Sequence, residues 1–297
     1  MNLAQLIAEY RSKANDTAQP PACDNIEVLA WLDDAEREAA VRAHLLFDDT
    51  TTAIREVAVV TNTAAYAKHA LALNVKRAVL EDADGNRLPL VVTNRADMDA
   101  MDDDWEGNDA GEPKYLVDEE STLTLVPTPA EDYTLYLSLF RLPLEDMGQT
   151  HAVTFQDTGD TVTDVAHGHA DGEPVLFVSI DQTTGIDALE IYYIRDAATN
   201  TYKLSASSGG VAMPLTTDGA GEVVYLGNSP EIHANHHRLL VEWVLFHAYS
   251  KRDEDIYDPS KASVHEARFA AAFGMRPDAN VRRKRRGNPT PTTRMVF

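Results

Sequence analysis

Cysteine and long apolar runs are almost absent from this chain of 297 residues. Its one cysteine, Cys23, forms no internal disulfide and supplies no thiolate metal site. No stretch approaches the roughly 18 apolar residues of a membrane span. The opening segment, MNLAQLIAEYRSK, lacks the basic start and continuous apolar run of a signal peptide. These absences argue against a membrane-spanning or secreted protein, and we expect it to be made and assembled in the cytoplasm.

Basic residues are also scarce, and they are unevenly placed. Lys and Arg number 26 against 48 Asp and Glu, which gives a net charge of −22. The segment 276–297 nevertheless carries +6, so the first 275 residues carry −28. Its basic residues are Arg276, Arg282, Arg283, Lys284, Arg285, Arg286 and Arg294. An acidic body binds no nucleic acid non-specifically, because phosphate affinity comes from cations. The basic segment indicates an arm that docks on an acidic partner or a neighbouring copy, with a solubilising tail as the alternative.

The long stretches of helical periodicity lie at the two ends of the chain. Apolar residues recur at helical spacing over 3–14, where Asn2 provides a cap, and over about 26–47, where Asp24 or Asn25 provides one. Helices return over 231–275, where Asp258-Pro259 begins the last one and Gly274 closes it. Apolar residues make up 44% of the chain and charged residues 25%, a globular composition.

The middle of the chain reads as two β regions. Residues 50–147 contain short strands near 57–60, 78–80, 88–92, 122–125 and 134–142, with a hairpin signal at Asp84-Gly85 and a helical turn or two over 96–105. Residues 150–226 contain short runs spaced by Gly, Asn and Asp, which is typical of a small sandwich or barrel.

The sequence thus predicts an α+β fold in three parts. A helical-bundle core with a small antiparallel sheet takes residues 1–147 and 228–275. An all-β sandwich or barrel is inserted at 148–227, and an extended basic arm occupies 276–297. Such an insertion requires the two points at which the core is interrupted, at 147 and 228, to lie close together. Exposed loop tips usually meet this condition.

No strong catalytic motif is present: the chain lacks a P-loop, GxGxxG, HExxH and GxSxG. We therefore expect no catalytic, cofactor-binding or metal site and no enzyme. Histidines offer two weaker candidates. His233 and His237, four apart beside His236 and Glu231, have the spacing of metal ligands, but a solvated or packed first helical turn explains them better. His167 and His169 alternate at an expected strand end near Asp171. A polar cluster at a turn explains them better than a metal site does.

Two further candidates concern sugars. Asp102, Asp103 and Asp104 could serve acid–base hydrolysis, but nothing places a second carboxylate across a cleft, and acidic runs are usually solvated. The aromatic residues Tyr192, Tyr193 and Tyr202 could stack on a sugar, although strand aromatics are more often core or cross-strand pairs.

Three segments in order resemble the head-to-tail adaptor family of tailed phages. DNIEVLAWLDDAEREAA is similar to the opening helix of that family. LTLVPTPAEDYTLYLSLFRLP resembles its central signature, in which a Pro-x-Pro turn joins two strands. The stretch from EIHANHHRLLVEW to EARFAAAFG resembles its late helical pair. These segments lie in residues 1–147 and 228–275. The region 148–227, which ordinary members lack, separately resembles a β module of phage tail proteins through DTVTDVAHGHADGEPVLF and IYYIRDAATNTYKLSASSGG.

The resemblance implies a structural virion protein of the neck. It would form a dodecameric ring between the portal protein and the tail tube or nozzle, through which DNA passes without specific binding. Its arm would reach the portal through Arg276, the basic residues at 282–286, Arg294 and Phe297, since arginine pairs bidentately with carboxylates. A ring of such copies would carry about −260 in total, and acids facing the lumen would repel phosphate. The inserted β module would face outward and contact another virion protein, such as a tail fibre.

Two other functions remain as alternatives at this point. One is a neck-associated hydrolase of cell-wall polymer. The other is a carbohydrate-binding or receptor-binding protein that acts through residues 148–227.

Overall fold

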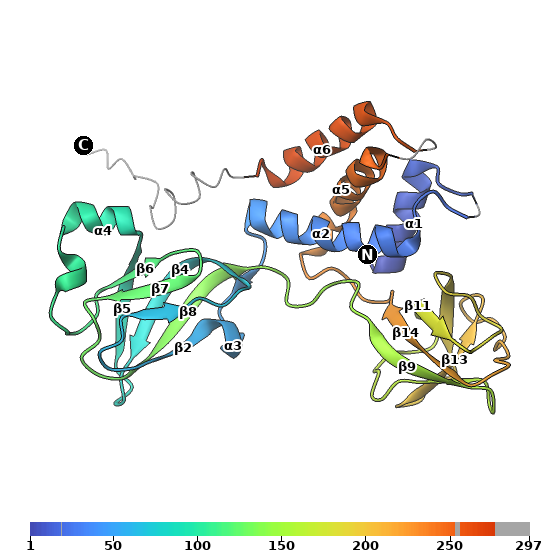
Figure 1. The fold of residues 1–297 in the computed structure, drawn as a ribbon, viewed down its shortest axis with the longest axis horizontal. Helices are drawn as coiled ribbons and strands as arrows, with labels where there is room; N and C mark the ends of the chain where they lie inside the picture. The colour runs from blue at the N-terminus through green and yellow to red at the C-terminus, as the bar shows by residue number, and fades with distance from the viewer. Residues whose placement is uncertain (19, 253–255, 277–297) are drawn as a thin grey trace. The chain divides into compact units, whose positions relative to one another are not determined.

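The computed structural model describes residues 1–18, 20–252 and 256–276, and it divides into two compact units (Figure 1). The helix–barrel unit contains Met1–Glu38 and Glu145–Phe273. The sheet unit contains Ala39–Leu144 together with the described residues 274–276. The three-part division expected from the sequence, with an insertion at 148–227, stays a prediction.

The expected helices are confirmed. They are α1 (Leu3–Ala14), α2 (Asn25–Ala43), α5 (His237–Ser250), preceded by the short helix η2 (Ala234–His236), and α6 (Pro259–Phe273). The caps follow the sequence signals. The Asn2 side chain accepts from the Gln5 amide, and Asp24 accepts from the Glu27 amide at 2.7 Å. Asp258 accepts from the amides of Ser260 and Lys261. Such caps satisfy amide groups that a helix leaves unpaired at its start.

Within the helix–barrel unit, α5 lies against both α1 and α6 (Figure 1). Glu242 on α5 joins them, because its carboxylate binds Lys13 of α1 at 2.9 Å and His265 of α6 at 2.8 Å. Trp243 on the same helix donates to Asp34 of α2 and packs its ring on Phe269 of α6. These contacts fix the four helices to one another through side chains of α5.

The other half of this unit is a closed antiparallel barrel in the order β10-β13-β12-β11-β14-β9. Its strands are β9 (His151–Gln156), β10 (Thr161–Thr163), β11 (Pro174–Asp181), β12 (Ile191–Arg195), β13 (Thr201–Ser205) and β14 (Gly219–Tyr225). Alternate residues fill its interior, among them Phe155, Phe177 and Val223. The sequence left sandwich and barrel open, and the structure is a barrel, in which no strand edge remains unpaired.

The sheet unit is larger than the small antiparallel sheet expected, and it is mixed rather than antiparallel. Its strand order is β1-β8-β4-β5-β6-β7-β3, and β2 also pairs with β8. The strands are β1 (Phe47–Asp48), β2 (Glu56–Val59), β3 (Ala65–Ala67), β4 (Ala72–Glu81), β5 (Arg87–Thr93), β6 (Tyr115–Asp118), β7 (Thr122–Val126) and β8 (Tyr133–Arg141). β5 and β6 run parallel because the chain crosses between them through α4 (Arg95–Met101) and the short helix η1 (Trp105–Gly107). The short helix α3 (Thr52–Arg55) precedes β2.

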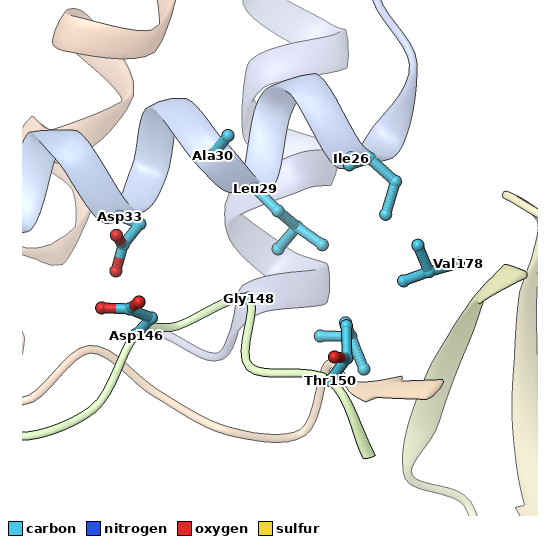
Figure 2. A pocket seen from close by; sticks show the side chains of 9 residues that line it. Ile26, Leu29, Ala30, Asp33, Asp146, Gly148, Thr150 and Val178 are labelled. Carbon is cyan, nitrogen blue, oxygen red and sulfur yellow. The ribbon is translucent and has the colours of Figure 1, made fainter. Parts of the chain in front are cut away.

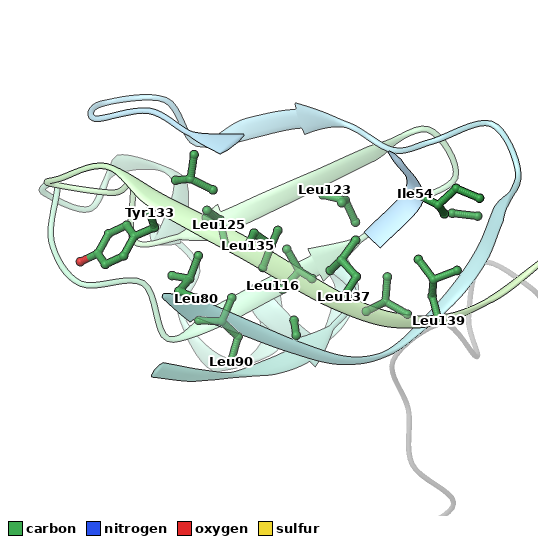
Figure 3. Close-up of a cluster of buried hydrophobic side chains, with 14 residues drawn as sticks. Ile54, Leu80, Leu90, Leu116, Leu123, Leu125, Tyr133, Leu135, Leu137 and Leu139 are labelled. Atoms are coloured by element: carbon green, nitrogen blue, oxygen red, sulfur yellow. The ribbon is translucent and has the colours of Figure 1, made fainter. Parts of the chain in front are cut away.

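Leucines from several strands form the core of the sheet unit (Figure 3). β8 alternates strictly, so Leu135, Leu137 and Leu139 point into the core and their neighbours point out. Two ion pairs are buried in the same unit, Lys68 with Asp118 and Arg141 with Asp48. In the part of the chain described, no helix is long and apolar enough to cross a membrane.

Candidate interaction surfaces

The histidines at the start of α5 do not converge on one point. His233 caps η2 by accepting from the Asn235 amide, and the His236 ring packs against Phe273. The His237 ring is buried and bonds to the Ile232 carbonyl at 2.8 Å and to the backbone of Met1. Among the described residues, no group of three or more His, Cys, Asp or Glu is arranged to hold a metal ion. His237 is a packed residue at the start of α5.

A buried carboxyl group holds the loop that leads into η2. Glu36 of α2 is 1% exposed and accepts from the Ile232 amide at 2.9 Å. Burial raises its pKa from the ordinary 4.5 to about 7, although the amides of Ile232 and Glu231 act in the opposite direction. The folded state therefore holds this proton more tightly than the unfolded state does.

This shift predicts a pH dependence of stability. A raised carboxyl pKa means that stability falls as the pH rises from about 4.5 to about 7. Glu36→Gln keeps an acceptor oxygen and removes the titration. We expect the loss of unfolding free energy between about pH 5 and about pH 8 to be smaller in this variant, by about 1–3 kcal/mol. Urea unfolding at both pH values measures it, with Glu266→Gln, an exposed site on α6, as the control. Equal losses in Glu36→Gln and the wild type would contradict the assignment.

The second histidine candidate is a packed cluster at one end of the barrel. His169 lies flat on Tyr225 at 3.7 Å between ring centroids, and its Nδ1 is 2.8 Å from the Glu173 carboxylate. The Tyr225 hydroxyl donates to Asp164 at 2.6 Å, and burial raises the pKa of this phenol above its usual value. Asp171 accepts from the Ala197 amide instead of joining the cluster. Stacking and hydrogen bonds hold this cluster together.

The aromatic candidates for sugar stacking are largely core residues. Tyr202 is fully buried and Tyr192 is 7% exposed, and both belong to the barrel core. The Tyr192 hydroxyl accepts from the Asp187 amide. Tyr193, between them in sequence, points to the other side of β12 and is half-buried. Two of the three rings are therefore inaccessible to a sugar.

The acidic run at Asp102 organises a turn. Asp102 accepts from the Asp104 amide and from the Asn108 side chain, which lowers the pKa of its carboxyl. Trp105 beside it is buried and donates to Asp99 at 2.8 Å. The run lies in the crossover between β5 and β6, a segment of residues 97–112 that contains eight acidic residues and no basic one. This acidic segment is a charged surface, since seven of its eight acids are exposed.

One cavity in the helix–barrel unit has a volume of about 210 Å³ (Figure 2). Its lining is mostly apolar: Ile26, Leu29, Ala30, Val178 and Val224, with Asp33, Asp146, Gly148 and Thr150. Burial raises the pKa of Asp33, and the neighbouring Asp146 raises it further. Arg37 binds both carboxylates, and the Met147 amide donates to Asp33 at 3.1 Å. These bonds attach the chain between β8 and β9 to α2, which gives the two acids a structural role.

Of the residues assigned to portal binding, the structure describes one. Arg276 is exposed and follows the end of α6. The remaining residues of the basic arm, Arg282, Arg283, Lys284, Arg285, Arg286, Arg294 and Phe297, lie outside the described residues. Their role stays a prediction.

Sequence reasoning missed a cationic and aromatic surface on the sheet unit. The β8 residues that point away from the leucine core include Tyr136 and Phe140. Strand register places Phe47 of β1, Arg77 of β4 and Arg87 of β5 on the same side. We call this side of strands β1, β8, β4 and β5 the outer face. Aromatic residues at the outward positions of an alternating strand, where polar residues are usual, are the signal that the sequence offered.

Cations cover the rings of the outer face. Lys76 Nζ lies 5.4 Å from the centre of the Phe140 ring, and the Arg55 guanidinium lies 4.9 Å from that of Tyr136. Arg87 approaches Tyr136 from 6.0 Å, and Phe47 meets Phe140 edge to face. Cation–π contacts of this kind hold positive charge over a hydrophobic surface. An otherwise acidic unit thus has one face on which Arg55, Lys76 and Arg87 lie over aromatic rings.

Taken together, the helices, the mixed sheet and the barrel define an α+β protein whose candidate residues serve packing and surface contact. The model of the SU10 adaptor protein family matches residues 1–170, more than half of the chain. The chain therefore belongs to the SU10 adaptor protein family. Membership makes it a phage adaptor-type structural protein, a virion component that contacts other virion components. No curated protein sequence matches the chain significantly.

Proposed function

We propose that this protein is a head-to-tail adaptor that forms a ring, joins the portal to the tail and lets DNA pass. The family match carries this proposal, because it assigns the chain to phage adaptor-type proteins. The division of charge supports it, since the first 275 residues carry −28 and the arm carries +6. An acidic ring would repel DNA phosphates during passage, and a basic arm would bind an acidic portal surface.

In this proposal each part of the chain has its own role. The helices α1, α2, α5 and α6 form a bundle that serves as scaffold of the ring, together with the sheet unit. The barrel is an insertion at 148–227 that contacts another virion protein, such as a tail fibre. Burial of Tyr192 and Tyr202 removes two of the three rings on which a sugar-binding role would rest.

The arm provides the test of portal attachment. Truncation after Asn280 removes Arg282, Arg283, Lys284, Arg285, Arg286, Arg294 and Phe297 but none of the described helices and strands. We expect the melting temperature to stay within about 1 °C of the wild type, because the buried core is untouched. We expect attachment to purified portal rings to weaken at least about tenfold at physiological salt, because several charge-assisted contacts are lost.

Cosedimentation with portal rings measures the attachment, and calorimetry measures the melting temperature. A chain with Lys203→Glu and Lys261→Glu changes charge without shortening the arm, and serves as the control. Unchanged affinity of the truncated chain for the portal would contradict the role of the arm.

A further inference from the structure

We propose that the outer face of the sheet unit binds the acidic segment, residues 97–112, of a second copy of this chain. The inference rests on the proposed ring and names the contact between neighbours within it. Both surfaces belong to the sheet unit, so each copy offers one of them to each of two neighbours.

The charge distribution of the sheet unit is the first argument. Residues 39–144 carry 9 basic and 19 acidic residues, so cations are rare there. Two of the nine, Lys68 and Arg141, are buried in ion pairs. Four of the other seven, Arg55, Lys76, Arg77 and Arg87, gather at the outer face. Such a concentration of cations in an acidic unit favours an acidic partner.

The ion pairs that these cations form, or lack, within the described residues also favour an acidic partner. Arg87 already binds Glu81 at 2.9 Å, and Arg55 lies 3.9 Å from Glu56. Lys76 and Arg77 are exposed, and no carboxylate among the described residues pairs with either. The Arg55 Nε is buried without a hydrogen-bond partner within the described structure. The outer face therefore offers two exposed cations, Lys76 and Arg77, to the carboxylates of a partner.

The acidic segment supplies the matching groups. Its eight carboxylates include Asp103 and Asp104, which are exposed and make no side-chain hydrogen bond among the described contacts. Met101 lies among them and is 56% exposed. On the outer face, Phe47 and Val91 are 53% and 57% exposed. Apolar groups surrounded by opposite charges are the usual composition of a protein interface.

Because each copy carries both surfaces at different places on its sheet unit, the same contact can repeat from one copy to the next. Val91 lies on the outer face near the end of β5, and the same strand leads through Asn94 into α4 and the acidic segment. The two surfaces are different parts of the sheet unit, so their contact is heterologous when each copy uses them with two different neighbours. A heterologous contact that closes produces a ring.

Duplex DNA is the competing partner for a cationic face. The face also carries Glu56 and Glu81, which leaves Lys76 and Arg77 as the cations without a carboxylate among the described residues. Phosphate binding by a protein usually needs more cations than that. A protein surface with a few well-placed carboxylates suits this face better.

Complementary charge reversal tests the interface with the full chain. One variant carries Lys76→Glu and Arg77→Glu, and the other carries Asp103→Lys and Asp104→Lys. Each alone should self-associate at least about tenfold more weakly than the wild type, and an equimolar mixture should recover association. Sedimentation equilibrium without portal, at about 50 mM and about 500 mM salt, measures the effect, and wild-type association should weaken at the higher salt.

The control carries Lys203→Glu and Lys261→Glu, the same charge change as Lys76→Glu with Arg77→Glu but in the other unit, and should associate as the wild type does. Circular dichroism and melting temperature verify that all variants fold.

A monomeric wild type at low salt, unchanged association in the variants, or a mixture that does not recover would overturn the proposal. Wild-type binding to duplex DNA that is lost with Lys76→Glu and Arg77→Glu would overturn it in favour of DNA. If the wild type forms rings that do not bind the portal, this result would contradict the adaptor function but not the proposed interface between copies.

Discussion

Replacing Asp118 with Ala is expected to lower the stability of the sheet unit by about 3–5 kcal/mol, because it leaves a charged ammonium group buried without its partner. The side chains of Lys68 and Asp118 are 1% and 2% exposed. Lys68 also donates to the Leu73 carbonyl at 2.7 Å, and Asp118 accepts from the Val75 amide at 3.1 Å. The pair therefore connects the start of β4 to the end of β6.

Hydrogen exchange of the amides of β4 and β8 measures this loss within the sheet unit, independently of the helix–barrel unit. Glu81→Ala removes an exposed pair with Arg87 and should cost less than about 1 kcal/mol. The double variant Lys68→Met, Asp118→Leu should recover most of the lost protection, because no charge then remains buried. Equal protection in Asp118→Ala and Glu81→Ala would refute a stabilising role for the buried pair.

Replacing Trp243 with Ala should destabilise the helix–barrel unit by about 3–5 kcal/mol. The Trp243 ring is 8% exposed and lies 4.7 Å from the Phe269 ring and 5.1 Å from the Phe246 ring. Its Nε1 donates to Asp34 at 2.6 Å. The change opens a cavity where α2, α5 and α6 meet and removes that hydrogen bond.

Trp243→Phe separates the two contributions. It retains a ring between the helices and loses the bond to Asp34, so it should cost about 1–2 kcal/mol. Hydrogen exchange of α5 amides in the two variants gives both values. Equal losses for the Ala and Phe variants would show that the hydrogen bond, rather than packing, accounts for the effect.

The elements that the sequence predicted well are those fixed by local signals. Asn2, Asp24 and Asp258 cap helices at the expected positions, and Gly85, with φ of 83°, forms the hairpin turn between β4 and β5. A positive φ favours glycine because other residues meet a steric penalty there. The Gly- and Asp-punctuated strands of 150–226 close into a barrel. The second helix ends at Ala43, four residues before its expected end at 47.

The features that escaped prediction depend on which strands become neighbours. Alternation along β8 indicates that one side is buried, but nothing in its period shows that β1, β4 and β5 place Phe47, Arg77 and Arg87 beside its outward aromatic residues. The parallel pairing of β5 and β6 likewise depends on the crossover through α4. Candidate residues chosen for their chemistry, such as His237 and Tyr202, proved to be buried packing residues.

We propose that this chain is a ring-forming adaptor of the phage neck. Native mass spectrometry of the full chain, with and without purified portal rings, tests it most directly. We expect a portal-bound complex with about one copy of this chain per portal subunit, as for stacked symmetric rings. A chain that stays monomeric and leaves the portal rings at their original mass would contradict it.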